Sequence, residues 1–351
     1  MTVIDAVRSD LDGVRAEVEA ALDRFLEDKA RAAPDPCLPP LVEVLRGFVS
    51  GGKRLRPLFC HTGFVAAGGA PGDPTPVSTG AALELFHTFA LVHDDVMDRS
   101  ALRRGRPTVH RLLAERLGDE RAGTSGAILV GDLCFAWSDE LLDSVDLDPA
   151  RRREVRALLH TMRTELIAGQ YLDLAPGARP AADPVRAALR VVRLKTARYS
   201  VELPLRVGAA LAGADAALKR VCGAYGRPVG EAFQLRDDLL GAFGDPRLTG
   251  KPDLDDLKEG KRTVLMALAW RQATPGQREV ISALHGAPDL DGERAERLRE
   301  VVRATGAADR VERMIEVRAQ RALAAVRTAD LAPVAKSLLT GLVALATRRG
   351  R

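Results

Sequence analysis

Three aspartates end the apolar stretch from Gly80 to Asp98, and their spacing suits a hard metal ion. The stretch reads GAALELFHTFALVHDDVMD, with Asp94, Asp95 and Asp98 at its C-terminal end. At about 100° per residue, Asp94 and Asp98 lie on one stripe of a helix. Their charges repel each other, and the negative end of the helix dipole adds to the cost. A cation would offset both effects, and oxygen ligands favour magnesium.

A second stretch, from Glu231 to Asp245, repeats this arrangement. It reads EAFQLRDDLLGAFGD, and Gln234, Asp238 and Asp245 lie along one helical stripe, with Asp237 about 80° to 100° away. Solvated helix ends would explain one such pair. Two pairs, each ending an apolar helix, favour metal binding.

Basic residues gather in two glycine-containing segments, GGKRLRP at 51–57 and RRGRP at 103–107. Either segment alone could be a solvated charge run. Carboxylates that hold magnesium, flanked by such cations, instead form a site for a diphosphate. Lysine is scarce, at 8 of the 52 basic residues, and four lysines lie in the segments that carry chemistry: Lys53, Lys195, Lys251 and Lys261.

Composition excludes several other classes of protein. The 351 residues are 46% apolar, and no apolar run reaches the roughly 18 residues of a membrane span. The start of the chain lacks the features of a signal peptide, so we expect a soluble, cytoplasmic protein. A net charge of +4 does not indicate nucleic-acid binding. The cysteines form no CxxC pair, which argues against zinc and disulfide frameworks; they are Cys37, Cys60, Cys134 and Cys222.

Apolar residues recur at helical spacing almost throughout, and alternating strand patterns are scarce. We therefore predict an all-α protein, with about ten or more helices divided by Gly/Pro clusters. No linker looks long or polar enough to divide two domains, so one domain is expected over residues 1–351, with two domains as the alternative. Pro204 lies inside a long helical pattern and predicts a kink near Ser200.

The motifs together resemble those of the trans-isoprenyl diphosphate synthases, the polyprenyl synthetase family. Between residues 51 and 261 they are GGKRLRP, HDDVMD followed by RRGRPTVH, GQYLDL, LKTA, and QLRDDLLGAFGDPRLTGKPDLDDLKEGK. The resemblance implies a bundle of long helices around a deep central cavity, usually in a homodimer. It also implies that the two aspartate clusters face each other across the cavity mouth, with three magnesium ions. The implied reaction joins isopentenyl diphosphate to an allylic diphosphate.

The resemblance implies roles for individual residues. The expected magnesium ligands are Asp94, Asp98 and Asp237, supported by Asp95 and Asp238. Positions for isopentenyl diphosphate are Lys53, Arg56, His87 and Arg104. Positions for the allylic diphosphate are Arg103, Lys195 and Lys251, with Lys261 as a further cation and with Thr196 and Gln234 near the reacting carbon. Outside the resemblance, His87 could equally be a core histidine and Thr196 a helix residue bonded to its own backbone.

One departure from the family pattern concerns the second aspartate motif. The family commonly has a third carboxylate where this chain has Gly241. Asp237 is then expected to bind metal together with Asp245 or water.

The reaction implied by the resemblance requires a dry, cationic site. Ionising the allylic C–O bond requires strong stabilisation of the leaving diphosphate. Water would trap the allyl cation, so apolar walls are expected from Leu85, Phe89 and Leu91. No protein base is evident, and the released diphosphate is expected to take the proton.

Two other functions share some of these features. A class I terpene cyclase shares the fold and the first motif, but its second motif has spaced Asn, Ser and Glu instead of Asp237 and Asp238. A non-catalytic partner subunit has little reason to keep both acidic clusters.

Product length is expected to depend on Phe89 and Ala90, which precede the first motif. A bulky Phe89, roughly 7.5 Å below Asp94 along the helix, would act as a floor. In the family, one aromatic residue at this place beside a small one accompanies C20 products, and two aromatics accompany C15. Geranylgeranyl diphosphate is therefore expected, with farnesyl diphosphate as the alternative.

Overall fold

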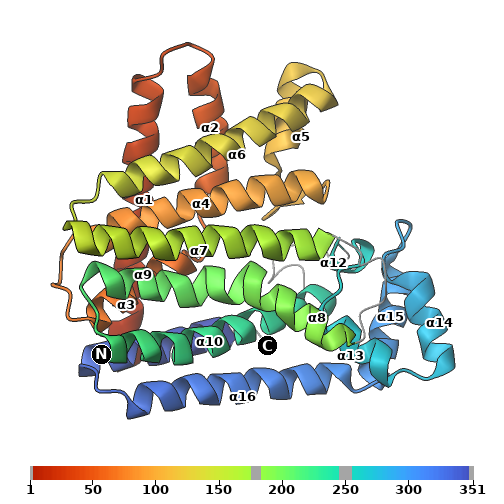
Figure 1. Ribbon diagram of the computed structural model, residues 1–351. Coiled ribbons are helices and arrows are strands. Elements are labelled where there is room, and N and C mark those ends of the chain that lie inside the picture. Colours follow the sequence, from red (N-terminus) through yellow and green to blue (C-terminus); the bar gives the residue numbers. More distant parts are fainter. Residues whose placement is uncertain (1–2, 175–182, 245–254, 348–351) are drawn as a thin grey trace. The chain divides into compact units, whose positions relative to one another are not determined.

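The computed structural model describes residues 3–174, 183–244 and 255–347. Helices dominate these residues, as Figure 1 shows, and the predicted all-α class is confirmed. In the described ranges, the strands are β1 (Leu102–Arg103) and β2 (Arg106–Pro107), which pair as one small hairpin. None of the described helices is long and apolar enough to cross a membrane. The chain divides into two compact units, and the prediction of a single domain stays a prediction.

Unit 1 comprises residues up to Arg156, Pro204–Leu218 and Ala332–Leu338. Within it, α4 packs most extensively against α6 and also contacts α3 and α1 (Figure 1). Its helices are α1 (Val3–Arg31), α2 (Leu38–Val49), α3 (Leu55–Ala66), α4 (Thr75–Met97), α5 (Val109–Leu117) and α6 (Glu120–Asp143), with the start of α7 (Pro149–Leu174) and most of α9 (Leu203–Leu211).

Two glycines set the close approach of α3 to α9 in unit 1. A Cβ atom on Gly208 would lie 1.7 Å from the Cys60 carbonyl oxygen, and one on Gly63 would lie 2.0 Å from the Leu205 carbonyl oxygen. No larger residue fits at either place. This contact fixes α3, whose first turn includes the end of the basic 51–57 segment.

Unit 2 comprises Ala157–Leu203, Lys219–Leu331 and the chain from Leu339 onward. Buried side chains of α8, α10, α13, α14, α15 and α16 form its apolar core. Its elements, besides the second half of α7, are α8 (Pro184–Val191), η1 (Val192–Glu202), most of α10 (Ala216–Phe243), α12 (Asp255–Lys258), α13 (Val264–Gln272), α14 (Pro275–Leu284), α15 (Gly292–Ala304), α16 (Ala307–Thr328) and the second part of α17 (Pro333–Thr347).

The backbone before Pro204 is a π-helix, η1, where a kink near Ser200 was predicted. Proline has no N–H to donate to the carbonyl four residues earlier, and its ring crowds that carbonyl. The turns widen, and the Leu203 N–H donates to the carbonyl of Arg198, five residues earlier. π-Helical turns are rare and occur frequently at functional sites.

Glycines of α7 and α10 allow both helices to approach η1. A Cβ atom on Gly169 would lie 2.6 Å from the backbone nitrogen of Lys195, and one on Gly230 would lie 2.5 Å from Ala197 Cα. The π-helix that carries Lys195 and Thr196 is therefore held against both neighbours in unit 2.

Candidate active site

The acidic end of α4 places two aspartates one turn apart. The helix ends at Met97, and the Asp98 N–H donates to the Asp94 carbonyl oxygen at 2.8 Å. Both side chains are half-buried, and 21% of the Asp94 side chain is exposed. Asp95 faces the protein interior and is 1% exposed. Asp94 and Asp98 can therefore reach a ligand, whereas Asp95 can bind only protein groups.

Arg103 is the partner of Asp95. Its Nε donates to the two carboxylate oxygens at 2.8 and 2.9 Å, and its Nη2 lies 2.6 Å from Oδ1. Burial raises the pKa of Asp95, and the guanidinium opposes that shift. Arg103 Nη2 also lies 3.8 Å from Asp94 Oδ2. The pair thus brings a cation to the edge of the acidic cluster.

The hairpin that carries Arg103 turns at Arg104 and Gly105. Their φ angles are 53° and 73°, and the left-handed conformation at both positions matches a two-residue turn between paired strands. Arg104 Nη1 donates to the Gly51 carbonyl oxygen at 3.2 Å. A Cβ atom on Gly52 would lie 2.9 Å from the Arg104 guanidinium. The hairpin turn therefore lies directly on the glycines of the 51–57 segment.

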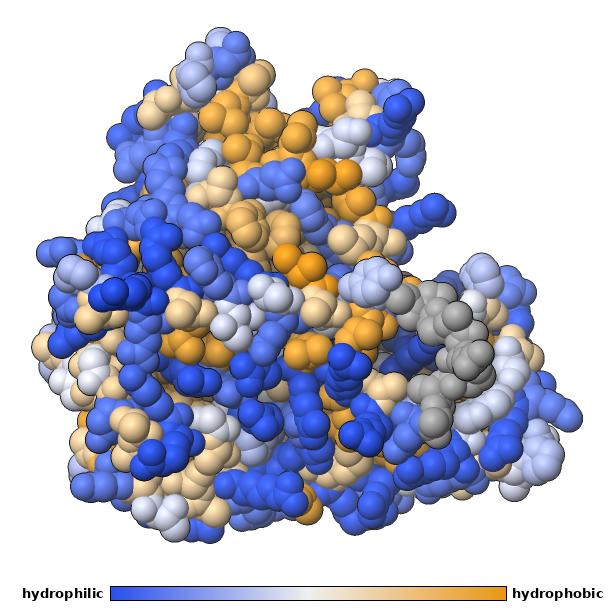
Figure 2. Space-filling view, in the orientation of Figure 1, coloured by the Kyte–Doolittle hydropathy of each residue, from blue (hydrophilic) through white to orange (hydrophobic). Residues whose placement is uncertain are grey.

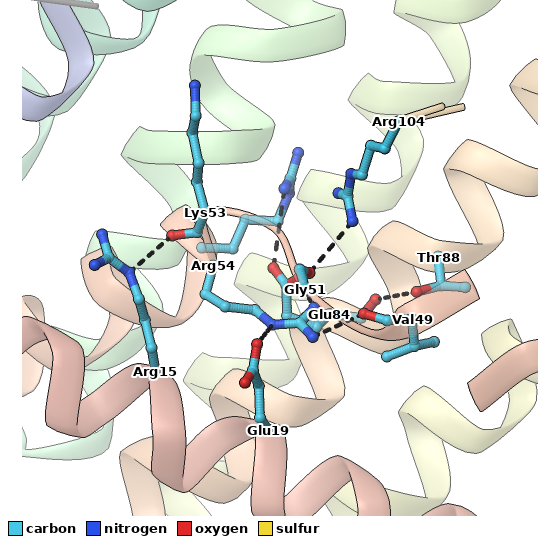
Figure 3. A network of polar contacts seen from close by, with 10 residues as sticks. Arg15, Glu19, Val49, Gly51, Lys53, Arg54, Glu84, Thr88 and Arg104 are labelled. Carbon is cyan, nitrogen blue, oxygen red and sulfur yellow. Dashed lines mark hydrogen bonds and ion pairs between the residues drawn. The ribbon is translucent and has the colours of Figure 1, made fainter. Parts of the chain in front are cut away.

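That segment forms a tight turn that leads into α3. Gly51, Gly52 and Arg54 all have positive φ angles, of 76°, 103° and 48°. Arg54 stands at the N-cap of α3, and Arg56 lies in the first helical turn. In Figure 3, Lys53 and Arg104 extend from the turn and the hairpin, while Arg54 points inward.

His87 lies one turn before Leu91 on α4 and is half-buried. Desolvation, with the positive charges of Arg56 and Arg104, lowers the pKa of His87 well below its usual range. The imidazole is therefore neutral near pH 7 and can offer one N–H. The predicted residues Lys53, Arg56, His87 and Arg104 all belong to unit 1, and we call them the basic pocket.

Unit 2 holds a second polar group of residues. Thr196 Oγ1 donates to Gln234 Oε1 at 2.7 Å, and Gln234 Nε2 donates to Asp238 Oδ1 at 2.7 Å. Lys195 Nζ donates to Asp173 Oδ2, also at 2.7 Å. Predicted residues of η1 and α10 are thus joined in one network. Thr196 bonds to a side chain of α10, which rules out the simpler expectation of a bond to its own backbone.

Each of the remaining predicted residues of unit 2 has its own surroundings. Asp237 is half-buried on α10, and Gly241 follows one turn later inside the same helix. Lys261 pairs with Glu259 at 2.6 Å. Lys251 and Asp245 lie outside the described residues. The expectation that the aspartate clusters of α4 and α10 face each other concerns two different units and stays a prediction.

Phe89, the predicted floor residue, belongs to an aromatic cluster between α4 and α6. Its ring centroid lies 5.3 Å from that of Phe86 and 5.1 Å from that of Phe135. It also meets the His93 ring edge-on at 4.7 Å. Ala90 is half-buried, whereas Leu85 is fully buried. Because a five-residue offset is about 140° around a helix, Phe89 and Asp94 lie on different faces of α4.

Comparison with known proteins identifies the family. Residues 39–304 match the polyprenyl synthetase family. The chain belongs to the polyprenyl synthetase family.

Relatives extend this match over most of the chain. It is 33% identical to the geranylfarnesyl diphosphate synthase of Aeropyrum pernix over 304 residues, which cover 86% of this chain and 90% of that protein. It is also 33% identical to a geranylgeranyl diphosphate synthase of Mycobacterium tuberculosis, covering 90% and 92% of the two chains. These polyprenyl synthetases are prenyl diphosphate synthases, and this chain is a prenyltransferase of the same family.

A solved polyprenyl synthetase has the same fold. The geranylgeranyl pyrophosphate synthase of Corynebacterium glutamicum matches with a TM-score of 0.92 and 37% identity, over 97% of this chain and 99% of that one. That structure holds an isoprenyl diphosphate and magnesium.

The acids of α4 fit a magnesium site of this type. Among the described residues, no three His, Cys, Asp or Glu side chains gather in a metal-binding cluster. Magnesium usually takes one or two carboxylates together with substrate phosphates and water. Asp94 and Asp98 are the carboxylates of α4 that would contribute to such a coordination sphere.

Three functional neighbours were not expected from the sequence: Glu84, Arg54 and Asp173. Glu84 accepts from Arg54 at 2.9 Å, and both residues are buried. A single acid within the apolar run GAALELFH was the available signal, because a buried carboxylate must be paired. For Asp173, the signal was the acid in the GQYLDL motif.

Proposed function

We propose that this prenyltransferase condenses isopentenyl diphosphate with an allylic diphosphate to give geranylgeranyl diphosphate. The observation that carries the proposal is the position of Asp94 and Asp98 in the same unit as the basic pocket. Metal-binding carboxylates beside several cations match the charge of diphosphates. The geranylgeranyl and geranylfarnesyl products that name the relatives support a chain of this length, and farnesyl diphosphate is the shorter alternative.

The residues of unit 1 have two roles in this proposal. Lys53, Arg56 and Arg104 bind the diphosphate of isopentenyl diphosphate, and neutral His87 adds a hydrogen bond. Asp94 and Asp98 would hold magnesium, which when bound would supply positive charge that stabilises the leaving allylic diphosphate. Arg103, fixed by Asp95, neutralises part of the same charge.

In this proposal, residues of unit 2 also bind the allylic substrate. Lys195 neutralises the allylic diphosphate, and Asp173 holds its ammonium in place. Thr196 and Gln234 present oxygen dipoles near the reacting carbon, where positive charge develops. Asp237 binds metal, supported by Asp238, while Lys251 and Lys261 add cations. No described residue is assigned as the base, so the released diphosphate takes the proton.

The proposal includes three magnesium ions, a cytoplasmic setting and a homodimer, as the resemblance implies. Figure 2 shows apolar side chains exposed over α5 and α6. Leu117, Ile128 and Leu129 are 59%, 41% and 60% exposed there. Exposed apolar patches commonly mark interaction surfaces, which supports pairing through this part of unit 1.

Incubation of the purified protein with isopentenyl diphosphate, an allylic diphosphate and magnesium tests the function. Chromatography of dephosphorylated products should show an extended alcohol that requires both substrates. Hydrocarbon from the allylic substrate alone would identify a cyclase. The absence of any product would indicate a non-catalytic subunit.

A further inference from the structure

Glu84 is a buried acid inside the most cationic part of unit 1. It lies in the middle of α4 and is 4% exposed. Its Oε2 accepts from Arg54 Nη1 at 2.9 Å (Figure 3). Its Oε1 lies 4.0 Å from Arg56 Nη1. Among the described residues, no donor forms a hydrogen bond with Oε1. One carboxylate therefore faces two arginines of the same turn.

Arg54 contacts three protein groups, which fix its position in the turn. Its Nη2 donates to the Val49 carbonyl oxygen at 2.7 Å, at the end of α2. Its Nε lies 3.5 Å from Glu19 Oε1 on α1. Its own backbone is left-handed, with φ 48° and ψ 38°, a conformation that is unfavourable for a residue with a Cβ atom. The buried ion pair with Glu84 holds this conformation in place.

The conformation of Arg54 determines where its neighbours point. Lys53 precedes it in the turn, and Arg56 follows it in the first turn of α3. A relaxed, right-handed Arg54 would redirect the chain between these two residues. The geometry of the basic pocket therefore depends on the contact between Arg54 and Glu84.

Electrostatics alone gives no reason for an acid at this place. A negative charge beside Arg56 and Arg104 repels an incoming diphosphate and makes the pocket less positive. Burying a carboxylate also costs free energy unless it is paired. The position of Glu84 is explained if its geometric contribution outweighs this electrostatic cost.

We propose that Glu84 is a positioning residue for isopentenyl diphosphate, acting through Arg54 and Arg56 without touching the substrate. This inference rests on the proposed function of the basic pocket. It assigns the two arginines different tasks: Arg54 shapes the turn, and Arg56 binds the diphosphate.

Two substitutions of Glu84 separate position from charge. Glu84→Gln keeps the shape and removes the charge, whereas Glu84→Asp keeps the charge and withdraws the carboxylate by one methylene. The positioning role predicts that each raises the KM for isopentenyl diphosphate by about tenfold, the effect of roughly one lost charged hydrogen bond. The KM for the allylic substrate should stay within about twofold. A purely electrostatic role predicts a lower KM for Glu84→Gln and an unchanged KM for Glu84→Asp.

Glu19→Gln is the matched control, because it removes the same charge from the more exposed side of Arg54. Its KM for isopentenyl diphosphate should stay near that of the parent protein. Circular dichroism establishes which variants fold, and if Glu84→Gln does not, Glu84→Asp decides alone. An unchanged KM in the folded Glu84 variants would overturn the inference.

Arg56→Ala distinguishes failure of this inference from failure of the proposed function. If Arg56→Ala raises the KM for isopentenyl diphosphate and the Glu84 variants do not, only the role of Glu84 is wrong. If Arg56→Ala also leaves that KM unchanged, the assignment of the basic pocket is wrong, and the role of Glu84 falls with it.

Discussion

Arg103 of the hairpin binds both carboxylate oxygens of Asp95, eight residues earlier on α4, through its Nε, at 2.8 and 2.9 Å. The central aspartate of the motif therefore holds an arginine, whereas its neighbours Asp94 and Asp98 are the proposed metal ligands. Residues adjacent in sequence thus have different tasks because the helix turns them to different faces.

Asp95→Asn should reduce kcat/KM for the allylic substrate by about 10- to 100-fold, the range typical of residues that orient binding groups. The reason is that Arg103 loses its charged partner. The magnesium concentration that gives half-maximal rate should change less than in Asp94→Asn. Equal shifts of the magnesium requirement in the two variants would contradict the assignment of Asp95 as a support.

Lys53→Ala and Lys195→Ala should affect different substrates. Lys53 extends from the turn before α3, whereas Lys195 is held by Asp173 on another element of the other unit. We expect Lys53→Ala mainly to raise the KM for isopentenyl diphosphate, and Lys195→Ala mainly to raise that for the allylic substrate. Steady-state kinetics with each substrate varied in turn measures both. Equal effects on both substrates in both variants would argue against two separate diphosphate sites.

His87 should make the protein sensitive to acid. Its folded pKa is lowered from an unfolded value of about 6.5, so the unfolded state binds more protons below that pH. The stability contributed by neutral His87 is present above about pH 6.5 and is lost as the pH falls. The parent protein should lose unfolding free energy when the pH falls from 7.5 to 5.5. In His87→Gln this loss should be smaller by about 1 kcal/mol.

Denaturant unfolding at the two pH values measures this effect of His87. The exposed His160→Gln on α7 serves as the control. A His87→Gln variant with the same pH dependence as the parent protein would show that folding does not lower the pKa of His87.

Phe89→Ala should lengthen the product, and Ala90→Phe should shorten it toward C15. Removing Phe89 opens a space beside Phe86 and Phe135, where a longer prenyl chain can extend. Chromatography of the dephosphorylated alcohols measures chain length. If neither substitution changes the product, the aromatic cluster is ordinary packing between α4 and α6.

The helices and the aspartate motifs of α4 and α10 could be predicted from the sequence, because the spacing of apolar residues and the positions of charges are local properties of the chain. The buried partners were harder to predict, because they pair residues far apart in the chain. Arg54 meets Glu84 thirty residues away, and Lys195 meets Asp173 twenty-two residues away. Only the folded chain selects such partners among 100 charged Lys, Arg, Asp and Glu residues, 52 basic and 48 acidic.

Local sequence patterns did not indicate the π-helix or the hairpin. Pro204 signalled a disturbance but not its form, and the close approach of Gly169 and Gly230 to η1 joins segments that are far apart in the sequence. In RRGRP, the left-handed Arg104 forms a turn whose charged residues gave no strand signal. The π-helical turns and the hairpin were therefore not predicted.

Asp94→Ala tests the central claim most directly, because this residue is assigned to the metal and is not buried in a structural pair. Turnover of isopentenyl diphosphate with an allylic diphosphate, at saturating substrates and magnesium, should fall by about three orders of magnitude or more, as expected when transition-state charge loses its main stabilisation. The helical circular dichroism signal should stay unchanged. A folded Asp94→Ala variant with near-normal turnover would contradict magnesium-assisted prenyl transfer at the acidic end of α4.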